Sequence, residues 1–192
     1  MQPDDPQFVF IGNNPAVDFT NTEIVGRDEL RDLLQRDADL ARWAQEAGFN
    51  IGSRLNPGDL SAARELRAAL KAVFQARIDG QSAGKKALAV VNRHLAHHCT
   101  REVLRTTGDG VEFELAPSRA ALSVSALLAS LAHEGARLLA SPQAEQLRHC
   151  GNPDCVLIFV DTSRSHKRRW CSMDTCGNRA KVAKHYRSHL SR

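Results

Sequence analysis

Four of the five cysteines lie within 27 residues near the end of this chain, and their spacing constrains the fold more than any other feature. Cys150 and Cys155 are separated by four residues, and the same spacing separates Cys171 from Cys176. Glycine, asparagine or proline lies within or beside each pair, so the backbone can turn and direct both sulfur atoms to one point. Structural zinc is coordinated tetrahedrally, and four thiolates complete that coordination. The pattern therefore predicts a structural Zn²⁺ site, with no position left for a catalytic water.

Two disulfides and a set of buried free thiols are the alternatives to a metal site. The start of the chain, Met1–Pro6, lacks the basic and then apolar layout of a secretory signal, which argues against an oxidising compartment. No apolar stretch approaches the roughly 20 residues that a membrane span requires. We therefore expect a soluble, cytoplasmic protein with no membrane partner, and we favour metal over disulfides.

Residues 1–147 are predicted to form one mostly helical domain with a little sheet. Apolar residues recur there at three- and four-residue spacing, which is typical of amphipathic helices, and alternating segments around Thr107–Gly110 predict a β-hairpin. The fold class is therefore α+β, with a predominantly α-helical N-terminal domain and a small β-hairpin. The predicted helices span residues 16–22, 28–48 (with a break near 35–37), 60–78, 82–98 and 118–140, and the predicted strands span residues 8–12, 102–106 and 111–115.

The remaining segment, residues 148–192, is too small to build a core of its own without a metal. A strand over 156–160, a turn over 162–165 and a helix over 178–190 are predicted around the cysteine pairs. This order of elements resembles a treble-clef zinc finger. His185 and His189 have the spacing of finger ligands, but two complete cysteine pairs make histidine ligation unnecessary.

Positive charge is concentrated in the same segment. Residues 150–192 contain nine Lys or Arg against three Asp, a net charge of +6, whereas the whole chain carries +4. This asymmetry indicates an anionic partner, and we favour DNA over a merely solvated surface. On a helical wheel Val182 and Tyr186 share a buried face with Arg179, so a structural role is expected for Arg179. The candidate nucleic-acid-binding residues are Arg164, Lys167, Arg168 and Arg169 before the second cysteine pair, and Lys181, Lys184 and Arg187 after it.

Asp18, Asn21 and Arg67 are polar residues that lie beside apolar ones on predicted helices. They either converge on a pocket for a small-molecule ligand or act as buried caps and ion pairs that hold helices together. The helical domain is accordingly a candidate sensor or homodimerisation domain. No Ser-His-Asp order, phosphate-binding glycine loop or H-E-x-x-H motif is present, so no catalytic residue is nominated and an enzyme is not expected.

Several short motifs resemble known families. Cys176-Gly177-Asn178-Arg179 is the signature of the CGNR zinc-finger family of bacterial proteins, which Cys150-Gly151-Asn152 and Arg169-Trp170-Cys171-Ser172-Met173 also resemble. Gly12-x5-Asp18-Phe19-x-Asn21-Thr22 resembles the start of the companion ABATE domain, and Trp43-x3-Ala47-Gly48 and Leu66-Arg67-x-Ala69-Leu70 resemble later parts of it. The resemblance covers nearly the whole chain. It implies a transcription regulator, described as stress-induced, with zinc-dependent DNA binding.

Together these features predict a two-part regulator, in which a helical body is joined to a zinc-stabilised basic module that binds DNA. One alternative is a zinc-stabilised module that docks an acidic protein. The other is a small-molecule enzyme in the helical body, with the finger as a substrate clamp. The salt dependence of DNA binding separates the first two functions.

Overall fold

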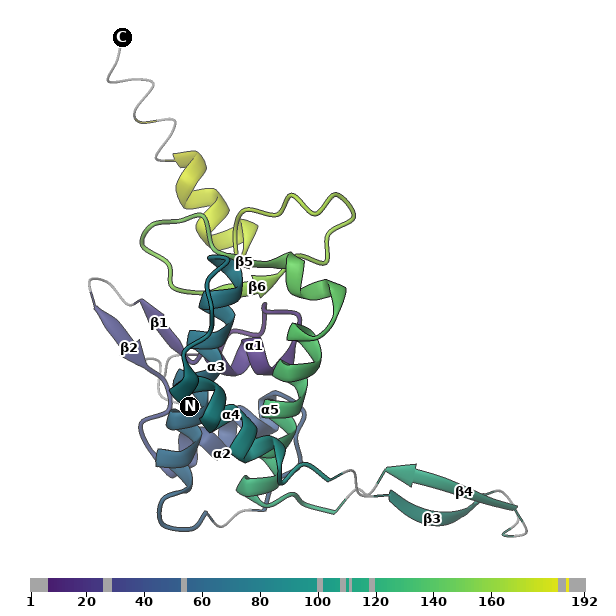
Figure 1. Ribbon diagram of the computed structural model, residues 1–192. Helices are drawn as coiled ribbons and strands as arrows, with labels where there is room; N and C mark the ends of the chain where they lie inside the picture. Colours follow the sequence, from purple (N-terminus) through teal and green to yellow (C-terminus); the bar gives the residue numbers. More distant parts are fainter. Residues whose placement is uncertain are drawn as a thin grey trace.

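The computed structural model describes residues 7–25, 29–52, 55–99, 102–107, 110, 112–117, 120–182 and 186. Helices are its main elements, and the strands form antiparallel pairs, β1 with β2, β3 with β4 and β5 with β6 (Figure 1). The predicted α+β class is confirmed. In chain order the elements are α1 (Pro15–Thr20), β1 (Glu23–Val25), β2 (Leu30–Asp32), α2 (Asp37–Glu46), α3 (Asp59–Ile78), α4 (Lys85–Leu95), β3 (Glu102–Thr107), β4 (Glu112–Pro117), α5 (Val124–Leu139), a 3₁₀ turn (Pro142–Gln146), β5 (Leu147–His149), β6 (Ile158–Val160) and a π turn (Met173–Gly177).

The core of the helical body lies where α1, α3 and α5 pack together. Leu66, Leu70 and Phe74 recur at four-residue spacing on α3, and all three are fully buried. Trp43 of α2 extends this core, because its ring packs on that of Phe19 from α1, with centroids 4.9 Å apart. None of the helices in the described ranges has both the length and the hydropathy that crossing a membrane requires.

Residues 8–12, predicted as a strand, do not form one. Their backbone runs beside the finger, where the Gly12 carbonyl accepts one hydrogen bond from Val160 N at 2.9 Å. The apolar run has another cause: Phe8 is buried in the core of the body, while Val9 and Ile11 pack against the cysteine cluster. The pattern therefore reflects burial between two cores, which periodicity alone does not distinguish from strand pairing.

The helix predicted over residues 28–48 is also wrong in its first part. Part of that segment is β2, which pairs with β1, and the helix α2 begins only at Asp37. The Asp39 carboxylate sets this start, because it accepts hydrogen bonds from Gln35 N at 3.1 Å and from Arg36 N at 2.8 Å. Residue 28 lies outside the described residues.

The predicted hairpin is confirmed as β3 and β4, with Glu102 opposite Pro117 and Thr107 opposite Glu112. It projects from the side of the helical body (Figure 1). The helix that follows was predicted to begin at residue 118, but α5 begins at Val124 because the Ser123 side chain caps it, accepting from Ala126 N at 3.2 Å.

The finger is joined to the body through β5 and β6. Leu147, Ile158 and Val160 are 1%, 1% and 2% exposed, and all three belong to the core of the body. There β5 packs against α3 and β6 packs against α1. The first hairpin of the finger is therefore part of the body's hydrophobic core rather than an appendage to it.

The helix predicted from residue 178 is present through Val182, and Tyr186 is also helical. The predicted burial of its apolar face is wrong, because Val182 is 54% exposed and Tyr186 is 67% exposed. Arg179, expected beside that buried face, is exposed as well. The small core of the finger is filled instead by the cysteines with Leu157 and Phe159.

Candidate metal centre and the surface around it

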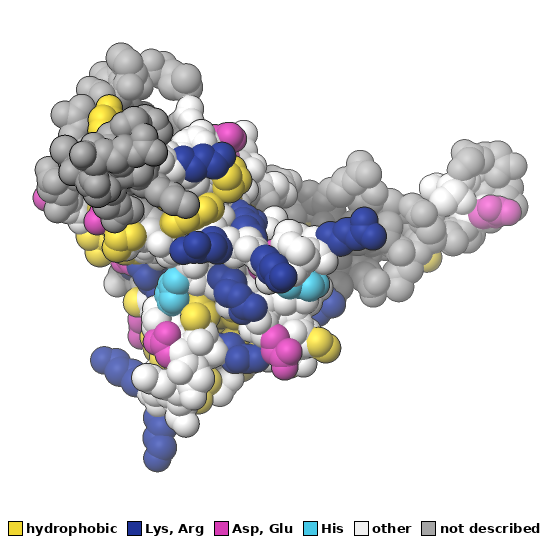
Figure 2. All heavy atoms as spheres, turned by 90° about the horizontal axis from the view of Figure 1, so that it is seen from above, with side chains coloured by type: hydrophobic (Ala, Val, Ile, Leu, Met, Phe, Trp, Pro, Cys, Tyr) yellow, Lys and Arg dark blue, Asp and Glu magenta, His cyan; other side chains and the backbone are white. Residues whose placement is uncertain are grey.

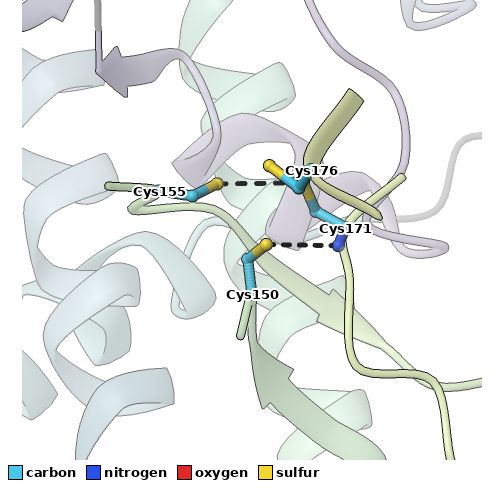
Figure 3. A group of neighbouring side chains, drawn as sticks. All are labelled: Cys150, Cys155, Cys171 and Cys176. Atoms are coloured by element: carbon cyan, nitrogen blue, oxygen red, sulfur yellow. Dashed lines mark hydrogen bonds between the residues drawn. The ribbon is translucent and has the colours of Figure 1, made fainter. Parts of the chain in front are cut away.

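The four cysteine side chains converge on one point (Figure 3). Their sulfur atoms all lie within 4.8 Å of one another. The Sγ atoms of Cys155 and Cys171 are 3.8 Å apart, and those of Cys171 and Cys176 are 3.6 Å apart. Zn–S bonds of about 2.3 Å in a tetrahedron require sulfur–sulfur distances of about 3.8 Å, so this donor set fits zinc. A disulfide needs a sulfur–sulfur distance of about 2.05 Å, and neither pair approaches it.

Glycine allows the two cysteine turns to approach each other closely. Gly151 donates its N–H to the Arg169 carbonyl at 2.7 Å, and a Cβ at Gly151 would lie 3.0 Å from that oxygen. A Cβ at Gly177 would lie 2.8 Å from Met173 Sδ and 3.3 Å from the Trp170 ring. Trp170 therefore fills the space between the turns, as part of the finger's core.

Hydrogen-bond donors surround the sulfur atoms. Cys171 N donates to Cys150 Sγ at 3.4 Å, and Asn152 Nδ2 donates to Cys176 Sγ at 3.5 Å. The hydrogen bond between the Cys171 and Cys155 side chains lowers the pKa of Cys155 to about 5 and raises the pKa of Cys171. Donors of this kind stabilise thiolates and orient them. The four cysteines would hold a zinc ion whose contribution is structural, because no coordination position remains for a substrate.

Asn21 attaches the finger to the body, because its side-chain amide forms the two hydrogen bonds with β6 that a neighbouring strand would otherwise form. Its Nδ2 donates to the Ile158 carbonyl at 2.9 Å, and its Oδ1 accepts from Ile158 N at 3.0 Å. Both bonds are buried, so losing them would leave the polar groups of β6 without partners. Asn13 adds a third bond, from its Nδ2 to the Val160 carbonyl at 2.9 Å. Both ends of α1 are thereby fixed to β6 of the finger.

Asp18 also lies on α1, and its carboxylate accepts a hydrogen bond from the backbone before that helix. Its Oδ1 accepts a hydrogen bond from Gly12 N at 2.7 Å. Burial raises the pKa of the Asp18 carboxyl to about 6, against the opposing effect of hydrogen bonds from Gly12 and Ile11.

The raised pKa of Asp18 makes stability depend on pH in a defined direction. The folded state holds the proton more tightly than the unfolded state, so the free energy of unfolding should fall as pH rises from about 4 to about 6. Asp18→Asn should remove this decrease, on the order of 1–2 kcal/mol after allowing for partial exposure. Urea unfolding at several pH values measures it, and an unchanged pH profile in the variant would contradict the assignment.

Arg67 is buried and holds the β1–β2 hairpin against α3. It forms ion pairs with Asp32 at 2.5 Å and with Glu23 at 3.2 Å, and it donates to Thr22 Oγ1 at 3.1 Å. The two carboxylates and the hydroxyl offset the cost of burying the guanidinium. Its contacts therefore match the ion-pair alternative considered above.

Asp18, Asn21 and Arg67 each make hydrogen bonds or ion pairs with other groups of the protein. A hollow of about 750 Å³ lies elsewhere, beside α2, and its lining includes none of the three. The small-molecule pocket assigned to them stays a prediction.

The basic loop, residues 162–169, is built on a buried carboxylate that sequence reasoning missed. Asp161 is 0% exposed, and its side chain accepts from Ser163 N at 3.0 Å, from Ser163 Oγ at 2.6 Å and from Arg168 N at 2.8 Å. Burial opposes the charge of Asp161, but the Ser163 and Arg168 hydrogen bonds outweigh it and lower the pKa. The loop is therefore held at both ends by one side chain. A lone aspartate before Thr-Ser is the only sequence signal, and it is typical of many ordinary turns.

Arg164, Lys167 and Arg169 are exposed on this loop, and Lys181 is exposed on the helix beyond the second cysteine pair. Figure 2 looks onto this end of the molecule and shows Lys and Arg side chains gathered near the centre of the face. The structure thus brings these four predicted residues to the surface of the finger. Lys184 and Arg187 lie outside the described residues.

Arg168 differs from its neighbours because its guanidinium is directed into the protein. It lies over the Phe159 ring at 4.2 Å and donates to the carbonyls of Ile11, Trp170 and Cys171. Arg168 therefore connects the basic loop, the cysteine turn and the body, and these contacts occupy the group that was predicted to bind DNA.

Comparison with protein families divides the chain at the 3₁₀ turn before β5. The family model of the CGNR zinc finger matches residues 146–189. The ABATE family model, described as "Putative stress-induced transcription regulator", matches residues 13–142. Both resemblances seen in the motifs are confirmed. No curated protein matches the chain significantly.

Proposed function

This chain belongs to the ABATE family and carries a CGNR zinc finger, and we propose that it is a transcription regulator that binds DNA through that finger. The observation that carries the proposal is the basic loop, which Asp161 holds in place while Arg164, Lys167 and Arg169 face solvent. Lys181 adds a fourth cation from the helix that follows the second cysteine pair.

The arrangement suits a phosphate backbone, which carries one negative charge per roughly 1.7 Å of DNA axis. The loop and the helix lie on either side of Cys171 and Cys176, so a zinc ion would hold their charges in a constant relative position. Lys184 and Arg187 stay predicted contacts, which the sequence places on the same helix. Phosphate contacts of this kind position a protein on DNA without selecting a base sequence.

Lys167→Ala should reduce the salt dependence of DNA binding by about 0.9 in the log–log slope, because one phosphate contact is lost. Arg168→Ala is the matched comparison, one residue away. It should lower the free energy of unfolding by about 2 kcal/mol, and with it the thermal unfolding midpoint, because its hydrogen bonds to three carbonyls are lost.

Titration of a labelled random duplex at several salt concentrations measures the slope, and circular dichroism measures unfolding. An unchanged slope for Lys167→Ala would contradict the contact. An unchanged unfolding midpoint for Arg168→Ala would contradict its internal role.

An acidic protein is the competing partner for the same cations. The duplex titration separates the two functions, because counterion release from DNA produces a linear dependence of log affinity on log salt concentration. Failure to bind duplex at low salt, with zinc bound, would favour the protein partner.

A further inference from the structure

His166 lies in the middle of the basic loop, and its backbone is in the left-handed region, at φ +49°. Few residues other than glycine adopt this conformation, and it persists where neighbouring contacts hold it. Two contacts do so here. His166 N donates to the Ser163 carbonyl at 3.1 Å, and the ring Nδ1 forms a hydrogen bond with the Asp161 carbonyl at 3.0 Å. The ring is therefore fixed to the base of the loop.

The contact with Asp161 determines which nitrogen of the His166 ring carries the proton. A backbone carbonyl only accepts hydrogen bonds, so Nδ1 carries a hydrogen and donates it. In the neutral imidazole Nε2 is then unprotonated and acts as an acceptor. Protonation adds a hydrogen at Nε2 and changes this atom into a charged donor. His166 is exposed, and none of the hydrogen bonds among the described residues involves its Nε2.

The Asp161 carboxylate is a counter-ion for a protonated His166. Burial opposes the charge of Asp161, the hydrogen bonds from Ser163 and Arg168 lower its pKa, and the charge of a protonated His166 contributes to that effect. The two opposite charges stabilise each other. The loop can therefore hold an imidazolium at this position without leaving a buried charge unpaired.

Cations flank His166 in the loop. Arg164 and Lys167 are both exposed, two residues before it and one residue after it. The 3₁₀ turn and β5 contact β6, which leads into the loop. Their ionisable side chains are Glu145 on the 3₁₀ turn, and Arg148 and His149 on β5. An anion that approaches His166 from solvent therefore meets a cation on each side of it in the sequence.

We propose that His166 is a further phosphate-binding residue of the finger, and that it binds DNA through Nε2–H only when its imidazole is protonated. This inference rests on the proposed DNA-binding function. A phosphate oxygen accepts the Nε2 hydrogen bond and is attracted by the cationic ring. The neutral ring offers a second acceptor to that oxygen, and two acceptors form no hydrogen bond. Because a histidine ordinarily changes charge near pH 6.5, duplex affinity should fall as pH rises through about 6.5.

Titration of a labelled random duplex at about pH 6 and about pH 8 tests this contact in the full, zinc-loaded chain. His185 and His189 are changed to asparagine in every protein compared, so that His166 is the one histidine after Cys150. This reference protein should bind about sixfold more tightly at the lower pH, if the bound phosphate raises the midpoint of protonation by about one pH unit. The salt slope should also be steeper at the lower pH, by up to about 0.9, because one more phosphate is neutralised. A purely structural role of His166 would not change that slope.

His166→Asn should remove this pH dependence and leave the affinity at the higher pH unchanged. Asparagine tolerates a positive φ, and its amide can donate to the Asp161 carbonyl in place of Nδ1. His166→Gly keeps the backbone conformation without any side chain and should behave in the same way. His97→Asn, at an exposed position after α4, is the matched control and should retain the sixfold change.

Zinc content and circular dichroism, measured at both pH values, establish that the proteins compared are loaded and folded. The inference would be overturned by equal pH dependence in the His166→Asn variant and the reference protein. It would also be overturned by a reference affinity that is the same at both pH values, and in either case DNA binding itself would stand. A reference protein that binds no duplex at either pH would overturn the proposed function and this inference together.

Discussion

Cys171→Ser should release zinc from the protein and unfold the turns around the cysteine cluster. Cys171 is 2% exposed, and its sulfur lies 3.8 Å from that of Cys155 and 3.6 Å from that of Cys176, so a hydroxyl there removes a ligand from the middle of the set. Zinc binding by such sites is worth about 10–16 kcal/mol, and that free energy is also folding free energy. We expect zinc content to fall from one equivalent to nearly none, as measured by elemental analysis.

Cys99→Ser is the matched control, because Cys99 is exposed and is not part of the cluster. It should retain one equivalent of zinc and the wild-type unfolding curve. Hydrogen exchange should rise in the Cys171→Ser variant around the cysteine turns, while β5 and β6 stay protected by the body. A Cys171→Ser protein that keeps its zinc would show that the four sulfurs are not the ligand set.

The second large effect is expected on cutting the chain after Gln146. The cut removes Leu147, Ile158 and Val160 from the body's core, and it leaves Asn21 without its partner on β6. Loss of a buried aliphatic side chain costs about 2–5 kcal/mol, so three such losses are comparable to the whole stability of a domain. Residues 1–146 should therefore retain helix but unfold without a cooperative transition, which thermal circular dichroism and calorimetry measure.

Ile158→Ala in the full chain is the milder version of this change and should cost about 2–4 kcal/mol. A truncated body that unfolds sharply near the wild-type temperature would contradict the shared core. It would instead support the independent domain over residues 1–147 that composition predicts.

Features with short-range signals could be predicted from the sequence. These signals are the cysteine spacing, the apolar stripe of α3 and the alternation around Thr107–Gly110. Each depends on residues that are close together in the sequence, and the structure contains the elements that they predict. Start positions were less predictable, because α2 begins where the Asp39 side chain caps it and α5 where Ser123 does. A capping side chain can set the first residue of a helix within a longer segment whose apolar periodicity predicts an earlier start.

The connection between finger and body could not be predicted, because its contacts are distant in sequence. Asn21 and Ile158 are 137 residues apart, and nothing in the spacing around Asn21 distinguishes a ligand-binding amide from one that pairs with a strand. Val182 and Tyr186 share an apolar helix face that the sequence predicts to be buried, but both side chains are exposed. Helical periodicity identifies an apolar face, but it does not say what covers that face.

The salt dependence of duplex DNA binding by the zinc-loaded protein tests the central claim most directly. Four phosphate contacts, from Arg164, Lys167, Arg169 and Lys181, predict a slope of about −3.6 for log affinity against log salt concentration. Changing Lys167 and Lys181 together to alanine should flatten that slope by about 1.8, with zinc content unchanged. Salt-independent binding, or full affinity after all four cations are neutralised, would contradict the assignment of the finger as a DNA-binding surface.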